Sequence, residues 1–467
     1  METELKDTYK GYVLHSLSNS QKVVKLQCDY SLDKRVINIL SAYEAKEMID
    51  YDLFFSALKL WVNRNDCLRI RFVKRKRELK SYFLEKIDEE ELIKYVDVLE
   101  FDNDNEYNKW IDDFKKKPIK YMKGEVFNVH YVKINNKLLN NRLFFVFKFC
   151  HMIIDIMGLV NIYNDLSNII DHLKNNNINE LKPTYQYEPI VIRDNQRQSD
   201  ELKNYEDDKK FFYDFLSSVK EPNYAPLSGY KIIEKSKEYK KGKKYRTMAL
   251  IRNDTIPIVL KIDNCHVKKM VDFCTYNHYS LSSVLLYLMA YVSSLRNNRV
   301  EEVMPIELCN CRGMIDEKKC GGTKAQSLAA YTKIDYNKSI KDNIDEFILL
   351  HQELFRHVSF DDCTFEKIIH KVFKSSLIGT YYNFSFSFIP VNENDKYKLH
   401  LYSNGKCALI VYSCAMFDYQ KNEIEMIYDY QYRVENEEGI RAFHEDLIKA
   451  IDLLDEDKMN IILNNIY

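Results

Sequence analysis

The chain is poor in glycine and proline, with 11 and 8 of them among 467 residues. Typical soluble proteins have about 7% glycine and about 5% proline, so collagen-like, linker-rich and low-complexity chains are excluded. An excess of charge is also missing, because 69 Lys and Arg residues face 70 Asp and Glu residues, which leaves a net charge of −1. Nucleic-acid-binding proteins usually carry a basic excess or stripe, so this balance argues against that function.

Long apolar runs are missing as well. The longest, at 284–292, is far shorter than the roughly 18 residues that cross a bilayer. The first residues, M-E-T-E-L-K-D, are acidic where a signal peptide is basic, and no apolar segment follows them. The 11 cysteines are odd in number and show no framework spacing, which is typical of reduced thiols. We expect a soluble cytoplasmic protein without membrane contact.

A metal site is not expected. The one cysteine grouping, at Cys309, Cys311 and Cys320, lacks the paired C-x-x-C spacing and the fourth ligand that zinc sites show. Gly321 and Gly322 are not part of a G-x-x-x-x-G-K-[ST] phosphate loop, so we interpret them as a flexible loop.

Helical and strand-like patterns alternate along the chain. A polar stretch at 183–207 separates two mixed halves, which predicts an N-terminal domain at 1–190, a linker at 191–210 and a C-terminal domain at 211–467. Apolar periodicity predicts helices at 52–63, 159–173, 280–292 and 441–454, and strands at 68–72, 142–149, 380–389, 397–402, 408–415 and 423–430.

One motif has the composition of a catalytic site: C-H-M-I-I-D-I-M-G at 150–158, between a predicted strand and a predicted helix. A side chain at a strand end is held rigidly yet faces solvent or a cleft. Imidazole in general has a pKa near neutrality, so a histidine at this position, His151, can accept and return a proton. The spacing H-x-x-x-D alone is weak, because His357 and Asp361 show it too. A buried structural histidine is the alternative interpretation.

The wider sequence resembles the condensation domains of nonribosomal peptide synthetases, which belong to the chloramphenicol-acetyltransferase-like acyltransferases with the hallmark H-H-x-x-x-D-G. Besides the motif, the segments at 63–72, 117–129 and 280–312 are similar to family segments in order and spacing. The resemblance covers about residues 30 to 455. It implies an α/β (α+β) fold with two acetyltransferase-like lobes, which form a V-shaped pseudo-dimer around a central substrate channel.

The resemblance places His151 on the catalytic histidine, Asp155 on a structural aspartate and Arg312 on the arginine that commonly pairs with it. Such a pair neutralises a buried carboxylate and fixes the histidine turn. Two positions depart from the family. Cys150 replaces the first histidine. Ile156 replaces the glycine after the aspartate, and the nearest glycine, Gly158, comes two residues late. A bulky side chain at 156 can narrow the channel or shift the turn.

Two further polar residues are candidates for the substrate channel. The alternating run at 381–387 puts Asn383 and Ser385 on one strand face. In the family a C-terminal strand lies opposite the histidine, where a polar side chain can donate to an oxyanion. An ordinary sheet face is the alternative. Basic runs at 74–77 and 240–244 are interpreted as solvated turns, or as docking sites for an acidic carrier protein or for coenzyme A phosphates.

The resemblance implies a stand-alone condensation-type acyltransferase with His151 as general base. It moves an acyl or aminoacyl group from a thioester on coenzyme A or on the phosphopantetheine of a carrier protein to an amine or hydroxyl acceptor. An acyl or peptidyl carrier protein acts in trans, and no cofactor is tightly bound. Two alternatives stay open: a catalytically degenerate member that binds a carrier protein or partner enzyme, favoured by Ile156, and a coenzyme A-dependent O-acyltransferase.

Related activities are excluded by missing motifs. The chain has no D-F-G-W-G element of plant-type acyltransferases, and Leu308 occupies the position of the glutamate that epimerisation domains need. It also has no carrier-protein serine motif, adenylation motif or thioesterase G-x-S-x-G.

Overall fold

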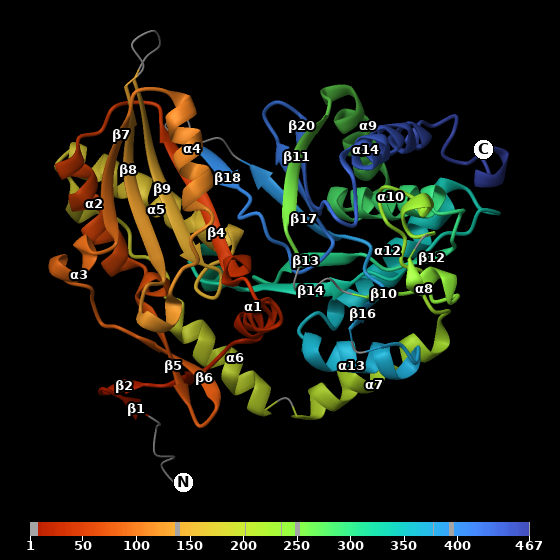
Figure 1. Cartoon of the computed structure of the whole chain (residues 1–467), viewed down its shortest axis with the longest axis horizontal. Helices are drawn as coiled ribbons and strands as arrows, with labels where there is room; N and C mark the ends of the chain where they lie inside the picture. Colours follow the sequence, from red (N-terminus) through yellow and green to blue (C-terminus); the bar gives the residue numbers. More distant parts are fainter. Residues whose placement is uncertain are drawn as a thin grey trace. The chain divides into compact units, whose positions relative to one another are not determined.

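The computed structural model describes residues 8–135, 141–200, 202–234, 236–247, 253–376, 378–391 and 397–466 (Figure 1). The chain forms two compact units. Unit 1 comprises Met1–Lys203, Asn310–Ala325 and Glu393–Asn404, and unit 2 comprises Asn204–Cys309, Gln326–Asn392 and Gly405–Tyr467. Two segments from the second half of the sequence therefore belong to unit 1. The change of unit between Lys203 and Asn204 lies within 191–210, where the chain forms helices α6 (Glu188–Asp200) and α7 (Leu202–Ser218).

Unit 1 is built on a five-stranded sheet in the order β18-β4-β9-β8-β7. Its strands are β18 (Tyr397–Tyr402), β4 (Asn38–Ala45), β9 (Arg142–Cys150), β8 (Phe127–Ile134) and β7 (Val96–Phe101). Only β7 and β8 run parallel. The central strand β9 confirms the prediction at 142–149, and its residues Leu143 to Cys150 are all buried because helices cover both faces.

Helices α2 (Tyr51–Arg64) and α5 (Ile156–Lys174) pack together on one face of this sheet. Phe147 of β9 contacts Trp61 and Tyr163 there. On the other face, Tyr107 of α4 (Asp104–Phe114) stacks on Phe144. The helix predicted at 52–63 is confirmed. The helix predicted at 159–173 begins three residues earlier than expected, because Asp155 caps it.

Smaller elements complete unit 1: β1 (Thr8–Tyr9), β2 (Tyr12–Val13), β3 (His15–Ser16), α1 (Asn19–Tyr30), β5 (Ile70–Arg75), β6 (Glu78–Phe83), α3 (Glu89–Ile93) and α11 (Ile315–Lys319). The strand predicted at 68–72 begins at Ile70, because a 3₁₀ turn occupies Asp66–Arg69. The basic run at 74–77 includes a hairpin turn with positive φ at Lys76 and Arg77.

Unit 2 contains a six-stranded sheet in the order β11-β20-β19-β17-β13-β14. The strands are β11 (Thr255–Ile262), β20 (Glu423–Gln431), β19 (Val411–Asp418), β17 (Ser385–Val391), β13 (Ile306–Asn310) and β14 (Ala325–Ala329). A large apolar core joins this sheet to helices α9 (Asn264–Asn277), α10 (Leu281–Arg296), α12 (Ile340–Arg356) and α14 (Glu437–Ile451). Residues Ser283 to Ser294 of α10 are all buried, which explains why this segment is the longest apolar run of the chain.

Other elements of unit 2 are α8 (Lys237–Lys240), β10 (Arg246–Thr247), β12 (Glu302–Val303), β15 (Thr332–Lys333), α13 (Asp362–Val372) and β16 (Gly379–Thr380). The predictions at 280–292, 397–402 and 423–430 are confirmed, and those at 408–415 and 441–454 are shifted by three to four residues. The strand predicted at 380–389 is wrong in its first half. Strand β16 ends at Thr380 and β17 begins at Ser385, so Asn383 lies between strands.

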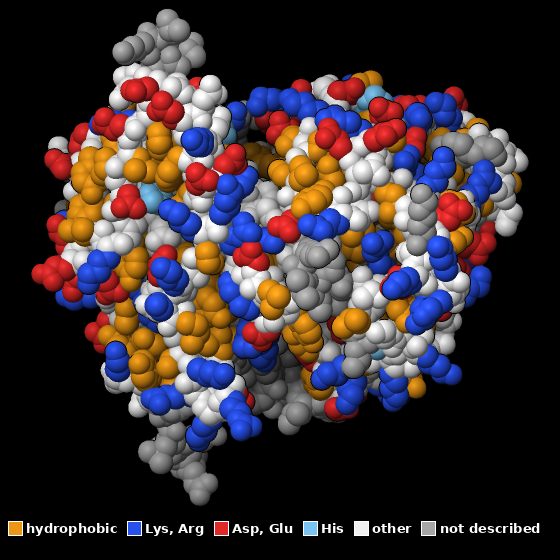
Figure 2. Space-filling model, in the orientation of Figure 1, with side chains coloured by type: hydrophobic (Ala, Val, Ile, Leu, Met, Phe, Trp, Pro, Cys, Tyr) orange, Lys and Arg blue, Asp and Glu red, His pale blue; other side chains and the backbone are white. Residues whose placement is uncertain are grey.

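Both signs of charge are spread over the surface. On the face that Figure 2 shows, Lys and Arg side chains are interspersed with Asp and Glu on both units. This agrees with the near-zero net charge. Among the helices described, none is long and apolar enough to cross a membrane.

Candidate functional site

His151 follows directly after the central strand of unit 1. The backbone N–H of Cys150 donates to Val126 O at 2.9 Å, and the N–H of His151 donates to Ile37 O at 2.8 Å. The Cα position of His151 is therefore held on both sides, although its side chain is only half-buried. A rigid backbone with an accessible side chain is the arrangement that a catalytic group needs.

A local hydrogen bond orients the imidazole ring. His151 Nδ1 lies 3.0 Å from the carbonyl oxygen of Ile154. A carbonyl can only accept, so Nδ1 carries the hydrogen in this contact. In the neutral ring Nε2 then has the free lone pair. The turn between β9 and α5 thus selects the tautomer in which Nε2 can accept a proton.

Asp155 closes the same turn and begins the helix that follows. Its Oδ1 accepts the N–H of Gly158 at 2.7 Å, the N-terminal cap of α5, and Nη2 of Arg312 at 2.6 Å. Its Oδ2 accepts the backbone N–H groups of Lys324 at 2.6 Å and of Ala325 at 3.0 Å. Burial opposes the charged form, but the charge of Arg312 and these donors outweigh it and hold the pKa of Asp155 below its ordinary value.

Arg312 comes from the 310–325 segment and is as deeply buried as its partner. Its side chain is 1% exposed and that of Asp155 is 4% exposed. Besides Asp155, the guanidinium donates to the carbonyl oxygens of Gly322 at 2.9 Å and of Glu317 at 3.3 Å. Neither charged group of this pair is accessible to a substrate, and both fix the turn that carries His151.

Gly321 and Gly322 lie in a loop, as expected, but both are buried within unit 1, so the expected flexibility is wrong. The carbonyl oxygen of Gly322 accepts the N–H of Asp155 at 3.2 Å. A Cβ atom on Gly158 would lie only 2.3 Å from this oxygen, and a Cβ on Gly321 would lie 2.4 Å from Cys67 Sγ. Close backbone approach explains why glycine stands at these positions.

The two departures from the family motif have different surroundings. Cys150 is completely buried, and burial raises the pKa of its thiol to about 12, so it stays a neutral core side chain. Ile156 is the first residue of α5 and is half-buried. The glycine that close packing requires is Gly158, where a Cβ would meet the Gly322 carbonyl oxygen. The next residue, Leu159, is buried in the core.

Asn383 and Ser385 belong to unit 2, not to the unit that carries His151. Asn383 is fully buried, and its amide nitrogen donates to Ser293 Oγ at 2.8 Å. Ser385 Oγ donates to Val411 O at 3.2 Å. Both donors are thus used within unit 2. The structure brings together His151, Asp155, Gly158 and Arg312, which the sequence analysis selected.

The second H-x-x-x-D spacing has a structural explanation. His357 Nδ1 contacts Asp208 Oδ1 at 2.5 Å, and Asp361 caps α13 by accepting the N–H of Thr364 at 3.1 Å. In the described part of the chain, no group of three or more His, Cys, Asp and Glu side chains has the arrangement of a metal site.

The sequence analysis missed the residues that clamp the 310–325 segment onto unit 1. Asn161 of α5 donates to the carbonyl oxygens of Lys318 at 2.9 Å and of Cys320 at 2.8 Å. Lys324 Nζ pairs with Asp194 at 3.0 Å. These contacts join residues more than 100 positions apart, so no local pattern indicates them. The one sequence signal for this close contact was the pair of adjacent glycines at 321 and 322, in a chain poor in glycine.

Comparison with known proteins places this geometry in a family. The profile of the condensation domain family matches residues 15–292, more than half of the chain. A search of curated protein sequences gave no match. Among solved structures, the starter condensation domain of rhizomide synthetase RzmA, an arginine-to-alanine variant in complex with C8-CoA, is similar with a TM-score of 0.78 at 14% identity, covering 96% of each chain.

Other condensation domains match to a similar degree. That of the monacolin K polyketide synthase MokA has a TM-score of 0.75 at 12% identity and covers 96% of this chain and 98% of its own. The first condensation domain of the calcium-dependent antibiotic synthetase, in complex with a substrate analogue, has a TM-score of 0.75 at 12% identity and coverage of 97% and 98%. The α/β, acetyltransferase-like fold expected from the sequence is thereby confirmed, and the chain belongs to the condensation domain family.

Proposed function

We propose that the protein is a condensation-type acyltransferase in which His151 Nε2 is the general base. The observation that supports this most directly is the bond between His151 Nδ1 and the Ile154 carbonyl, at 3.0 Å. It leaves Nε2 as the accepting nitrogen of a half-buried ring on a rigid strand end. A buried structural histidine would have both ring nitrogens paired inside the protein.

The proposed reaction joins a thioester donor to an amine or hydroxyl acceptor. The acceptor nitrogen or oxygen attacks the thioester carbonyl, and its proton passes to His151 Nε2. The tetrahedral intermediate then collapses, the carbon–sulfur bond breaks, and the departing thiolate takes the proton back from the imidazolium. One amide or ester bond forms, one thioester bond breaks, and the histidine ends neutral. The thioester is the only co-substrate that this chemistry needs.

Asp155 and Arg312 act through the turn in this proposal, not on the substrate. Their mutual burial keeps them away from reacting atoms. By capping α5 and binding the 310–325 segment, Asp155 fixes the carbonyl of Ile154, which in turn fixes the imidazole. They are positioning residues.

The donor is proposed to be a coenzyme A thioester or a thioester on a carrier protein that acts in trans. A variant of the RzmA starter domain was crystallised with C8-CoA and Leu-SNAC together, which suggests octanoyl-coenzyme A and an aminoacyl thioester mimic as first probes. The coenzyme A thioester can be combined with an amine acceptor or with an alcohol acceptor, so it tests both amide and ester formation. A carrier protein that bears the same octanoyl group shows whether the enzyme prefers a carrier-bound donor or a coenzyme A donor.

A second candidate function rests on Ile156. A β-branched side chain stands where the family motif has glycine, directly beside the histidine turn. A non-catalytic member that binds a carrier protein or partner enzyme would retain the fold and the Asp155–Arg312 pair without turnover.

The test compares the wild-type chain with His151→Ala and His172→Ala, using octanoyl-coenzyme A or octanoyl-carrier as donor and Leu-SNAC or an alcohol as acceptor. His172 is a half-buried histidine at the other end of α5 and serves as the matched control. We expect His151→Ala to lose about 100-fold or more of the rate, the size of a general-base contribution, and His172→Ala to keep it. Product formation at the wild-type rate by His151→Ala contradicts the mechanism. If the wild type binds the carrier protein but forms no product, the non-catalytic function is supported instead.

A further inference from the structure

Three lysines are deeply buried in the described part of the chain: Lys148, Lys324 and Lys406, which are 2%, 5% and 8% exposed. Lys324 pairs with Asp194 at 3.0 Å, and Lys406 pairs with Asp254 at 2.7 Å. Lys148 differs, because among the described residues its Nζ forms no ion pair and its hydrogen-bond partners are neutral. Buried charges are normally paired, so an unpaired lysine in the sheet of unit 1 needs an explanation.

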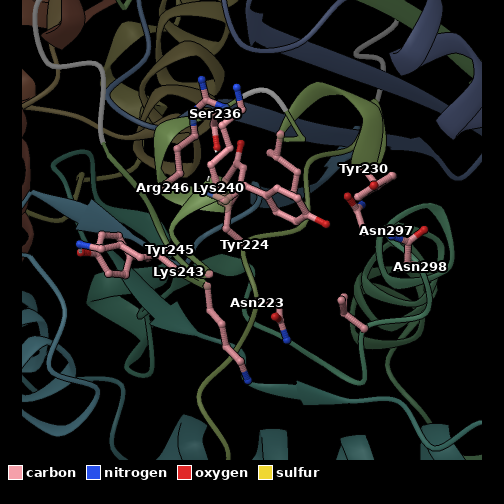
Figure 3. Close-up of a pocket in the computed structure, with 15 residues that line it drawn as sticks. Asn223, Tyr224, Tyr230, Ser236, Lys240, Lys243, Tyr245, Arg246, Asn297 and Asn298 are labelled. Atoms are coloured by element: carbon pink, nitrogen blue, oxygen red, sulfur yellow. Dashed lines mark hydrogen bonds between the residues drawn. The ribbon is translucent and has the colours of Figure 1, made fainter.

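Lysines at the surface show the ordinary arrangement. Lys240 and Lys243 line a cavity of about 570 Å³ in unit 2 (Figure 3), and both side chains are exposed. Such lysines keep the ammonium group in water and need no partner inside the protein. Lys148 instead belongs to the central strand β9, where every residue from Leu143 to Cys150 is buried.

Lys148 caps the C-terminal end of helix α4. Its Nζ donates to the carbonyl oxygen of Phe114, the last residue of α4, at 2.6 Å, and to that of Lys117 at 3.0 Å. The same Nζ lies 3.4 Å from the centroid of the Phe114 ring. The end of a helix carries partial negative charge and carbonyl groups without internal partners, which attract a cation. Carbonyls and a ring carry no full charge, however, so they offset the burial of an ammonium less than a carboxylate does.

Two charged groups act on Lys148 from neighbouring parts of the chain. Lys117, in the segment after α4, has a like charge, and Glu125, just before β8, has an opposite charge but forms no ion pair with it. Burial and then the charge of Lys117 oppose the ammonium form, and Glu125 favours it. The net effect lowers the pKa of Lys148 to about 7.

The neighbouring strands add no charge next to Lys148 near neutral pH. Asn128 of β8 lies opposite it, and the residue opposite it on β4 is apolar. His130, on the same face of β8, contacts the Phe114 ring edge-on, with the ring centroids 4.5 Å apart. Burial outweighs the charge of Asp97 and lowers the pKa of His130 to about 4, so its ring is neutral at pH 7. Lys148 is thus the group of this cluster that changes charge near pH 7.

The segment after α4 also supports the strand end that carries His151. Asn38, the first residue of β4, donates its amide to Lys117 O at 3.0 Å and accepts the N–H of Ile119 at 3.2 Å. The preceding residue, Ile37, accepts the N–H of His151 at 2.8 Å. The contacts of the buried lysine therefore continue through this segment and the start of β4 to the histidine turn.

We propose that Lys148 is a proton-sensitive clamp, which couples local opening of the segment at 115–119 to the uptake of a proton. In the closed segment Nζ is buried, and a neutral amine still has two hydrogens for the two carbonyl oxygens. In the open segment Nζ is in water, where the charged form is favoured. Opening above neutral pH therefore takes up a proton and becomes rarer as the pH rises. The inference does not depend on the acyl-transfer activity.

This coupling has a distinctive effect on amide hydrogen exchange. Between about pH 7 and about 10, the closed form has lost the proton that the open form keeps. Each pH unit then lowers the population of the open form about tenfold, while hydroxide speeds exchange from the open form about tenfold. The two effects cancel, so the observed rate stays nearly constant. An opening that takes up no proton gives a rate that rises about tenfold per pH unit.

The test measures hydrogen exchange of the full chain by mass spectrometry from about pH 7.5 to about 9, in peptides that contain Lys117 and Ile119. The N–H groups of these residues donate to Phe114 O at 3.1 Å and to Asn38 Oδ1 at 3.2 Å, so they exchange when the segment opens. We expect a nearly constant rate in the wild type. A wild-type rate that rises about tenfold per pH unit overturns the proposal, whether or not the variants fold.

Two variants assign the effect to Lys148. Lys148→Met removes the titratable group, and Lys148→Arg replaces it with a cation that keeps its charge at every pH of the experiment. We expect the rate to rise about tenfold per pH unit in both, although one side chain is neutral and the other is charged. Lys133→Met is the matched control and should keep the constant rate, because Lys133 of β8 is half-buried and pairs with Glu100 at 3.9 Å. A constant rate that persists in Lys148→Met overturns the proposal.

Discussion

Among individual residues, Asp155 links the local and the long-range structure of the site. One of its oxygens caps α5 and accepts from Arg312, and the other accepts two backbone N–H groups at Lys324 and Ala325. A carboxylate with this many donors tolerates complete burial. The role that family resemblance gives to this residue, support of the histidine turn, is therefore consistent with its contacts.

Replacing Arg312 with Met leaves the buried carboxylate without its cation. We expect a loss of about 3–5 kcal/mol in the free energy of unfolding at pH 7, measured by urea denaturation. The loss shrinks as the pH falls below about 4. The pKa of Asp155 is depressed in the folded state, so its contribution is present above the unfolded pKa and disappears as the pH falls through the folded pKa. A loss that stays constant down to pH 2 contradicts the ion-pair explanation.

Gly158→Ala tests the close approach between α5 and the 310–325 segment. The new Cβ would lie 2.3 Å from the Gly322 carbonyl oxygen, a backbone atom that cannot rotate away. We expect a loss of about 1–3 kcal/mol by thermal denaturation, although alanine is the better helix former. Gly313→Ala is the matched control, because its Cβ meets nothing nearer than Glu317 Oε2 at 3.9 Å. Equal stability of the two variants rules out the steric explanation.

Among the elements, helix α5 has two structural roles, and its first two turns contribute to both. Its apolar face packs on the sheet of unit 1 through Leu159, Ile162 and Tyr163. Its N-terminal turns bind the 310–325 segment through Asp155 and Asn161. The helix therefore couples the histidine turn to a segment that comes from the second half of the sequence.

Asn161→Ala removes two hydrogen bonds to Lys318 and Cys320 carbonyl oxygens. We expect amide hydrogen exchange in 310–325 to accelerate about tenfold, because the segment loses two hydrogen bonds that hold it to α5. Amides of β4 and β9 should keep their protection. Asn175→Ala, an exposed residue at the other end of α5, serves as the control. Uniform acceleration across unit 1 would indicate global destabilisation and not release of the segment.

At the scale of the whole molecule, unit 1 is discontinuous in sequence. Besides the 310–325 segment, it takes its edge strand β18 from residues 397–402, which pair with β4. His400 of this strand and Arg142 hydrogen-bond to Glu44. Burial opposes ionisation there, but these bonds prevail and lower the pKa of Glu44 to about 2. Unit 1 is therefore completed by a segment that comes after most of unit 2 in the sequence.

A fragment of residues 1–203 should not fold to the native unit. It would expose the edge of β4 and leave Asp155 and Glu44 without their partners from 312 and 400. We expect a collapsed or aggregating species with poor dispersion of amide resonances, whereas the full chain gives a dispersed spectrum. A fragment with native-like dispersion and a cooperative thermal transition would show that the two inserted segments are dispensable.

Local sequence patterns were sufficient to locate most helices and strands and the catalytic candidate. The apolar run of β9, the periodic faces of α2 and α5, and the position of His151 at a strand end all follow from short-range patterns, because burial imposes a period on nearby residues. Family resemblance added Arg312 as the partner of Asp155. Local pattern failed at two places. At 321–322 the glycines allow close packing and do not indicate flexibility. At 381–384 the side chains alternate as in a strand, but the backbone does not pair with a neighbouring strand.

The distant segments that complete each unit become apparent only in the folded chain. The return of 310–325 and 397–402 to unit 1 rests on contacts between residues more than 100 positions apart, to which no local periodicity corresponds.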